Sequence, residues 1–158
     1  MSRVRTILLI CTGNSCRSVM AAGLLKKMLK GKGDYKVATA GVAALTGAGA
    51  TGQTFQVMAE NGIELTHHVS QQLTNEMLRE ADLILVMERA HKEHILKRLP
   101  AVGKKLHLLS EFGRPQEENK LVDPNVPDPI GQSLDFYRKV FAIIKEGIER
   151  VVKSLEEG

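Results

Sequence analysis

Short apolar runs alternate with longer amphipathic stretches along this chain. Four short runs have the aliphatic and β-branched composition of strands: residues 6–11, 35–39, 82–87 and 106–109. Four longer stretches repeat apolar residues at helical spacing: residues 18–30, 53–61, 90–99 and 133–155. Strands that alternate with helices are typical of parallel sheets, because each connection has to cross a face of the sheet. The pattern predicts an α/β fold.

Two of the predicted strands are apolar at every position, at residues 7–10 and 83–86. Strands buried on both faces have this composition, which favours a doubly wound sheet covered by helices on both sides. Such sheets bind ligands beyond the carboxyl ends of their strands, where Cys11 lies. We expect two long loops, residues 41–52 and 113–131, to lie on the same rim.

The last predicted helix has one broad apolar face. Its members are Leu134, Phe136, Val140, Phe141, Ile144, Ile148, Val151, Val152 and Leu155. A face of this width predicts a helix that packs on the core rather than on a partner protein. The chain has 158 residues, 43% of them hydrophobic, and shows neither a repeat nor a linker. These features predict a single domain that spans residues 1–158.

The formal net charge is +4, from 22 basic and 18 acidic residues that are dispersed along the chain. Four Phe and two Tyr are the only aromatic residues besides histidine, and none of them clusters with Lys or Arg. Nucleic-acid binding is therefore not expected, since it would require a basic tract or a stacking platform. A mildly positive surface does suit an enzyme that takes a phosphorylated substrate.

The cellular location is predicted from the cysteines and the first residues. Cys11 and Cys16 lie five positions apart, where a disulfide would stabilise little of the fold, which indicates a reducing compartment. The N-terminus shows no signal-peptide pattern, and no run approaches 18 apolar residues. We expect a cytoplasmic protein that does not bind membranes.

The most specific motif joins the first strand to the first helix and reads Cys-Thr-Gly-Asn-Ser-Cys-Arg-Ser, residues 11–18. A loop at this junction directs backbone N–H groups and a helix N-terminus at a bound anion. The same field lowers the pKa of a thiol, so Cys11 is expected to be ionised. Arg17 offers a planar fork that can hold two phosphoryl oxygens. A buried strand-end thiol beside an ordinary first-turn arginine would not require all four residue types, Cys, Gly, Arg and Ser, at this junction. The loop is not a nucleotide-binding loop either. It lacks the pattern G-x-x-x-x-G-K-[ST], and it has a nucleophile at the phosphate position where such a loop has Lys.

Splitting a phosphate ester or amide requires an acid that protonates the leaving group. Two aspartates are candidates, Asp123 before Pro124 and Asp128 before Pro129. Proline stiffens each loop and biases the preceding residue toward extended backbone. Either aspartate could instead be an ordinary turn residue.

The chain resembles the low-molecular-weight protein tyrosine phosphatase family over essentially its whole length. The resemblance rests on the motif at residues 11–18, Thr-Ala-Gly at 39–41, Ala-Asp-Leu-Ile-Leu-Val-Met at 81–87 and Asp-Pro-Ile-Gly-Gln-Ser at 128–133. It implies a flavodoxin-like three-layer α/β/α fold with a four-stranded parallel sheet and the phosphate-binding loop after strand 1. It also implies a cysteinyl-phosphate intermediate, with Cys11 as nucleophile, Arg17 as phosphoryl clamp and Asp128 as acid and then base.

The resemblance assigns supporting roles as well. It implies that the Ser18 hydroxyl hydrogen-bonds the thiolate, and that Asn14 holds the loop in a strained geometry with His68 as its brace. Cys16 resembles the second loop thiol, which could trap oxidised Cys11, or it is a small buried filler. Asp123 is either unrelated to the reaction or a supporting carboxylate.

The substrate-binding residues are expected to be those of the loop, together with one residue of the acid loop: Thr12, Gly13, Asn14, Ser15, Cys16, Ser18 and Ile130. Family members that act on phosphotyrosine often have an aliphatic residue where this chain has Ser15, Tyr where it has Ile130, and an aromatic residue after the Gly41 counterpart. This chain has no aromatic residue at 42–52. Phosphotyrosine is the predicted substrate, and phosphoarginine is the alternative because a small polar residue at Ser15 resembles the protein-arginine phosphatase branch.

Two other functions would also use a phosphate-binding loop of this kind. Thioredoxin-coupled arsenate reductases share the motif at 11–18 but need further cysteines in mid-chain, and no cysteine follows Cys16. A non-catalytic phosphoprotein-binding module would lack the nucleophile or the acid. No cofactor and no metal are expected, since His91 and His94 at i, i+3 have no third ligand nearby and indicate a solvated helix face. The expected partners are phosphorylated proteins, with the chain a monomer or a weak homodimer.

Overall fold

A four-stranded parallel sheet forms the centre of the molecule, in the order β2-β1-β3-β4. The computed structural model describes residues 3–65, 67–120 and 122–157. The strands are β1 (Thr6–Cys11), β2 (Lys36–Gly41), β3 (Leu83–Val86) and β4 (Leu106–Leu108). β1 lies between β2 and β3, with Ile7 opposite both Val37 and Leu83. The apolar runs in β1 and β3 are almost fully buried, which confirms the prediction of strands covered on both faces.

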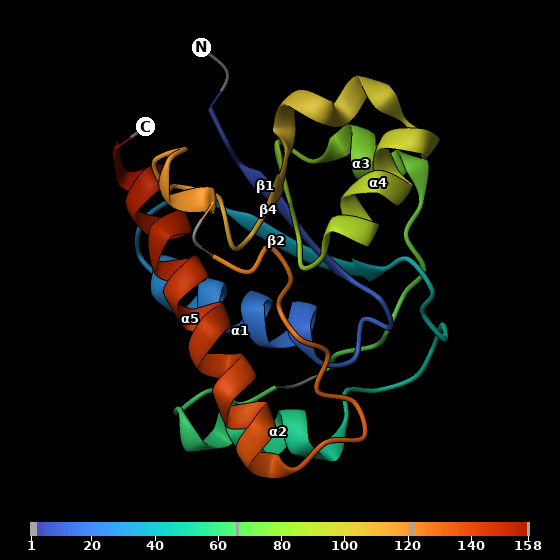
Figure 1. Cartoon of the computed structure of the whole chain (residues 1–158). Helices are drawn as coiled ribbons and strands as arrows, with labels where there is room; N and C mark the ends of the chain where they lie inside the picture. The colour runs from blue at the N-terminus through green and yellow to red at the C-terminus, as the bar shows by residue number, and fades with distance from the viewer. Residues whose placement is uncertain (1–2, 66, 121, 158) are drawn as a thin grey trace.

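Helices cover both faces of this sheet (Figure 1). α1 (Arg17–Leu29), α2 (Gly52–Glu60) and α5 (Leu134–Glu157) lie on one side, while α3 (Asn75–Glu80) and α4 (Arg89–Arg98) lie on the other. Alternate side chains of β1 divide the core accordingly: Ile7 and Leu9 pack with α1 and α5, while Leu8 and Ile10 pack toward α3 and α4. The flavodoxin-like three-layer α/β/α arrangement is confirmed.

The predicted strands and long helices are present, with ends shifted by one or two residues. α3 was not predicted, because its six residues are too few to show a helical period. It begins after Thr74, whose hydroxyl accepts a hydrogen bond from the N–H of Met77. Two short 3₁₀ segments, Pro100–Lys105 and Glu118–Lys120, were also missed, and the second lies inside the predicted 113–131 loop. Leu121 of that loop lies outside the described residues.

α5 packs on α1 and α2 with the apolar face that the sequence predicts. Six of the nine predicted residues are buried and the other three are partly buried against the same core cluster. The prediction of a core-packing helix is therefore confirmed. Among the described helices, none combines the length and the apolar composition that spanning a membrane would need.

Candidate active site

The loop at residues 12–16 leaves the carboxyl end of β1 and enters α1 at Arg17. Gly41, at the end of β2, lies against it so closely that a Cβ there would be 2.5 Å from the carbonyl oxygen of Thr12. The two residues after Gly41 hydrogen-bond this part of the chain. The N–H of Val42 donates to the carbonyl of Cys11, and the N–H of Ala43 donates to the carbonyl of Thr12. The shape of the loop therefore depends on a glycine outside it.

Asn14 holds the loop from within. Its φ of 55° lies in the left-handed region, which is uncommon for residues other than glycine. Its amide nitrogen donates to the Ser18 hydroxyl at 2.8 Å, and its amide oxygen accepts the N–H of Gln71 at 3.0 Å. Its backbone carbonyl accepts from the Ser70 hydroxyl at 2.7 Å and lies 2.8 Å from Nε2 of His68. The structure thus places His68 on Asn14, together with two neighbours that the sequence did not single out.

The sulfur of Cys11 lies 3.0 Å from the Ser18 hydroxyl oxygen, and both side chains are buried. Because Asn14 donates to that oxygen, the hydroxyl hydrogen of Ser18 is available to the sulfur. A hydroxyl donates a stronger hydrogen bond to a charged acceptor than to a neutral one. The N-terminus of α1 lies at the same place and adds a positive potential.

Arg17 is only 1% exposed. Its Nη1 group donates to Oε2 of Glu88 at 2.6 Å and to the carbonyl of Val126 at 2.8 Å. Its Nη2 group donates to Oγ1 of Thr12 at 3.3 Å. Within the described residues, the Nε–H of Arg17 has no hydrogen-bond acceptor and Nη2 has one, so N–H groups of the guanidinium remain for phosphoryl oxygens.

The two candidate acids lie in different surroundings. Oδ2 of Asp128 is 3.7 Å from Nη2 of Arg17, and the Asp128 side chain is 42% exposed. Its other oxygen accepts the N–H of Ile130 at 3.1 Å, and Ile130 is itself exposed. Asp123 instead accepts the N–H of Asn125 at 2.9 Å within its own turn. Of these two aspartates, Asp128 is the one that lies within 4 Å of the Arg17 guanidinium in the described part of the chain.

His91 corrects the sequence interpretation. It was expected on a solvated helix face with His94, but it is 3% exposed, whereas His94 is exposed. Its Nδ1 accepts the N–H of Glu88 at 3.1 Å, and its Nε2 lies 2.9 Å from Oγ1 of Thr12. Burial, and then the positive charge of Arg17, lower the pKa of His91 to about 4. The first turn of α4 faces the loop, which helical spacing alone does not reveal.

The side chain of Cys16 contacts two residues that the sequence did not single out. Its sulfur lies 3.5 Å from the Tyr137 hydroxyl and 3.7 Å from that of Thr51. Burial, and then the hydrogen bond with Cys16, raise the pKa of Tyr137 to about 12. In the sequence Tyr137 is one more residue of the amphipathic helix α5, so the pattern does not indicate its contact with the loop. Of the expected substrate-binding residues, Cys16, Asn14 and Ser18 are buried.

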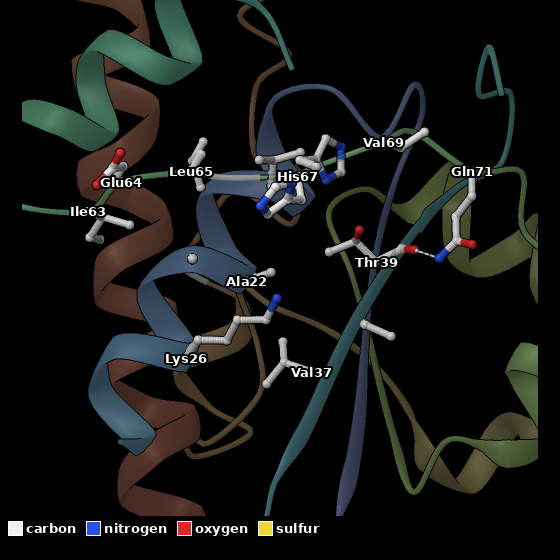
Figure 2. Close-up of a pocket in the computed structure, with 14 residues that line it drawn as sticks. Ala22, Lys26, Val37, Thr39, Ile63, Glu64, Leu65, His67, Val69 and Gln71 are labelled. Atoms are coloured by element: carbon white, nitrogen blue, oxygen red, sulfur yellow. Dashed lines mark hydrogen bonds between the residues drawn. The ribbon is translucent and has the colours of Figure 1, made fainter. Parts of the chain in front are cut away.

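A cleft of about 470 Å³ lies between α1, the edge of β2 and the segment at residues 63–71. Lys26 and Ala22 extend into it from α1 and Val37 from β2, while Gln71 donates to the carbonyl of Thr39 (Figure 2). Thr66 of that segment lies outside the described residues. Cys11 is not among the described residues that line the cleft, and two lining residues, His68 and Gln71, hydrogen-bond Asn14 of the loop. No group of three potential metal ligands occurs within the described ranges.

Known proteins resemble this chain in sequence and in fold. A family model described as low molecular weight phosphotyrosine protein phosphatase matches residues 6–158. The low molecular weight protein-tyrosine-phosphatase Etp of Escherichia coli is 35% identical over 153 residues, which are 97% of this chain and 96% of the relative. The protein-arginine-phosphatase of Bacillus subtilis is 33% identical over 152 residues, or 96% of this chain and 97% of the relative.

Two solved structures share the fold over nearly the whole chain. The tyrosine phosphatase AmsI of Erwinia amylovora has a TM-score of 0.85 at 33% identity, covering 97% of this chain and 94% of that one. The YwlE arginine phosphatase of Geobacillus stearothermophilus has a TM-score of 0.85 at 35% identity, with the same coverage. The chain belongs to the low molecular weight phosphotyrosine protein phosphatase family, whose members are cysteine-based phosphatases.

Proposed function

We propose that this chain hydrolyses phosphotyrosine-type phosphomonoesters on proteins, with Cys11 as nucleophile, Arg17 as phosphoryl clamp and Asp128 as the acid. The observation that carries the proposal is the position of Arg17. Its guanidinium is held by Glu88 and Val126, its Nε–H has no acceptor among the described residues, and its Nη2 lies 3.7 Å from Oδ2 of Asp128. One side chain thereby connects the loop of the nucleophile with the loop of the acid.

In the first step the Cys11 thiolate attacks phosphorus and the bond from phosphorus to the leaving oxygen breaks. The leaving oxygen takes the proton of the Asp128 carboxyl, and the phosphoryl group stays on sulfur as a cysteinyl phosphate. Arg17 and the loop N–H groups hold the equatorial oxygens, where charge is spread in the transition state.

In the second step Asp128, now a carboxylate, takes a proton from water as the water oxygen attacks phosphorus. The bond from sulfur to phosphorus breaks, which releases inorganic phosphate and the thiolate. Ser18 donates to that sulfur at 3.0 Å and makes it a better leaving group. Asn14 supports this role because it occupies the acceptor side of the Ser18 hydroxyl.

Phosphoarginine is the second candidate substrate. Ser15 places a partly exposed hydroxyl in the loop, and Ile130 and Leu45 are exposed aliphatic residues on the segments that border it. These residues provide no aromatic surface for stacking a tyrosine ring. Two of the relatives and solved structures above are described as arginine phosphatases, which supports keeping this candidate.

The mechanism is tested with a phosphotyrosine peptide. Cys11→Ser should abolish turnover, because a hydroxyl stays protonated where a thiol ionises. Arg17→Lys should lose orders of magnitude, because an ammonium cannot hold two oxygens in one plane. Wild-type turnover should be unaffected by a chelator. Turnover by Cys11→Ser at the wild-type rate would contradict the proposed nucleophile.

The substrate is tested by assaying phosphotyrosine and phosphoarginine peptides side by side. Ser15→Ile should raise the ratio of phosphotyrosine to phosphoarginine turnover by roughly 10- to 200-fold, the usual range for a methylene-scale change in a pocket. A wild-type preference for phosphotyrosine that Ser15→Ile leaves unchanged would assign the protein to the tyrosine branch and remove the role of Ser15.

A further inference from the structure

The hydrogen bonds of His91 define its protonation state. The backbone N–H of Glu88 points at Nδ1 with a donor-to-acceptor distance of 3.1 Å, so Nδ1 is the unprotonated nitrogen. The ring is therefore neutral and carries its hydrogen on Nε2. Nε2 then donates to Oγ1 of Thr12 at 2.9 Å.

The Thr12 oxygen accepts a second hydrogen bond, from Nη2 of Arg17 at 3.3 Å. A hydroxyl oxygen has two lone pairs, and both are then in use. Its own hydrogen has no acceptor among the described residues. Thr12 follows Cys11 directly, and its oxygen lies beside the nitrogen that would hold the phosphoryl group. Thr12 is only half-buried, so its free hydrogen can reach an anion bound beside Arg17.

We propose that His91 is a positioning residue that holds the Thr12 hydroxyl as a hydrogen-bond donor to the phosphoryl group of the substrate. The inference rests on the proposed function of the loop, and it adds a side-chain donor to the backbone donors and to Arg17. His91 itself does not touch the substrate. Its Nε2–H uses one of the two lone pairs of the Thr12 hydroxyl oxygen, and Arg17 uses the other. The Thr12 hydroxyl can therefore act toward the substrate only as a donor.

Two substitutions of His91 separate this role from a structural one. Gln places an N–H donor where Nε2 lies, so His91→Gln keeps the bond to Thr12 and loses the acceptor for Glu88. Asn places an acceptor where Nδ1 lies, so His91→Asn keeps the Glu88 bond and loses the donor. His94→Gln and His94→Asn are matched controls on the exposed side of the same helix.

The readouts are kcat and KM on a phosphotyrosine peptide and the dissociation constant for inorganic phosphate. Thr12→Val should lower kcat by about 10- to 100-fold with a smaller change in KM, because a donor to transition-state charge is lost. It should weaken phosphate binding by about two- to tenfold. Thr12→Ser should restore both. His91→Asn should move both in the direction of Thr12→Val, whereas His91→Gln should stay near wild type.

A double variant decides whether the two residues act together. Thr12→Val combined with His91→Asn should cost no more than Thr12→Val alone, since His91 acts only through that hydroxyl. Equal losses in His91→Asn and His91→Gln, or additive losses in the double variant, would overturn the inference. If wild type shows no turnover at all, the proposed function fails, and the phosphate dissociation constants of the same variants still decide the role of His91.

Discussion

Arg17 and Glu88 form an ion pair with 2.6 Å between Nη1 and Oε2, although they are 71 residues apart in the sequence. The arginine begins α1 and the glutamate precedes α4, so the pair joins helices on opposite faces of the sheet at its carboxyl edge. A nearly inaccessible guanidinium requires a counter-charge. Glu88 supplies that charge, and it also orients the fork of Arg17.

Glu88→Ala should lower the free energy of unfolding by about 1–3 kcal/mol, because a buried cation loses its partner. Saturating inorganic phosphate should recover more stability in this variant than in wild type, because the bound dianion supplies the missing charge. Urea unfolding with and without phosphate measures both effects. Glu93→Ala, an exposed position on the same helix, is the control and should show neither. An equal phosphate effect in all three proteins would contradict the pairing role of Glu88.

Asp128→Asn should lower kcat by about 10²- to 10⁴-fold on a phosphotyrosine peptide, the usual contribution of general acid catalysis. The loss should shrink for aryl phosphates with activated leaving groups, which need little protonation. Asp123→Asn should matter far less, since that carboxylate shapes its own turn. Steady-state kinetics on both substrates give the comparison. A larger loss of kcat in Asp123→Asn than in Asp128→Asn would contradict the assignment of Asp128 as the acid.

The depressed pKa of His91, about 4 instead of 6.5, makes stability depend on pH. Below pH 6.5 the unfolded chain binds a proton at this ring that the native protein does not, so stability falls as the pH drops from 6.5 toward 4. The full effect is about 3 kcal/mol. Chemical unfolding should show that the free energy of unfolding falls less between pH 7 and pH 5 in His91→Gln than in wild type. Identical losses would mean that His91 is not neutral in the native state.

Gly41→Ala should reduce both stability and activity, because its Cβ would lie 2.5 Å from the Thr12 carbonyl and 3.0 Å from the N–H nitrogen of Asn14. Backbone atoms cannot swing aside as a flexible side chain can, so we expect a cost of about 1–3 kcal/mol. Gly49→Ala is the control, since nothing lies within 4 Å of a Cβ there. Thermal unfolding and kcat test the pair, and a harmless Gly41→Ala would show that the loop can move.

The sheet could be predicted from the sequence because residues 7–10 of β1 and all of β3 are apolar, a composition that few other elements share. The long helices followed from their period. α3 could not be found in the same way, because a helix of six residues completes fewer than two turns. Its start was encoded only by the hydroxyl of Thr74.

The candidate site was predictable where chemistry and chain proximity coincide, as they do for Cys11 and Arg17. It was not predictable where partners come from distant segments. Glu88 reaches Arg17 from the segment after β3 and Tyr137 reaches Cys16 from α5, and neither lies in a recognisable motif. His91 was misassigned because helical spacing relates it to His94 but does not show which turn of α4 lies over the loop.

The burial of Cys11 also determines which reagents can modify it. Its side chain is buried, and under the proposed function an electrophile has to enter by the route of the phosphoryl group, beside the Arg17 cation. Alkylating agents that carry a carboxylate should therefore label this cysteine faster than their uncharged amide counterparts, the reverse of the order at an exposed thiol beside acidic residues. The same loop that would recognise a phosphate selects the charge of a covalent inhibitor.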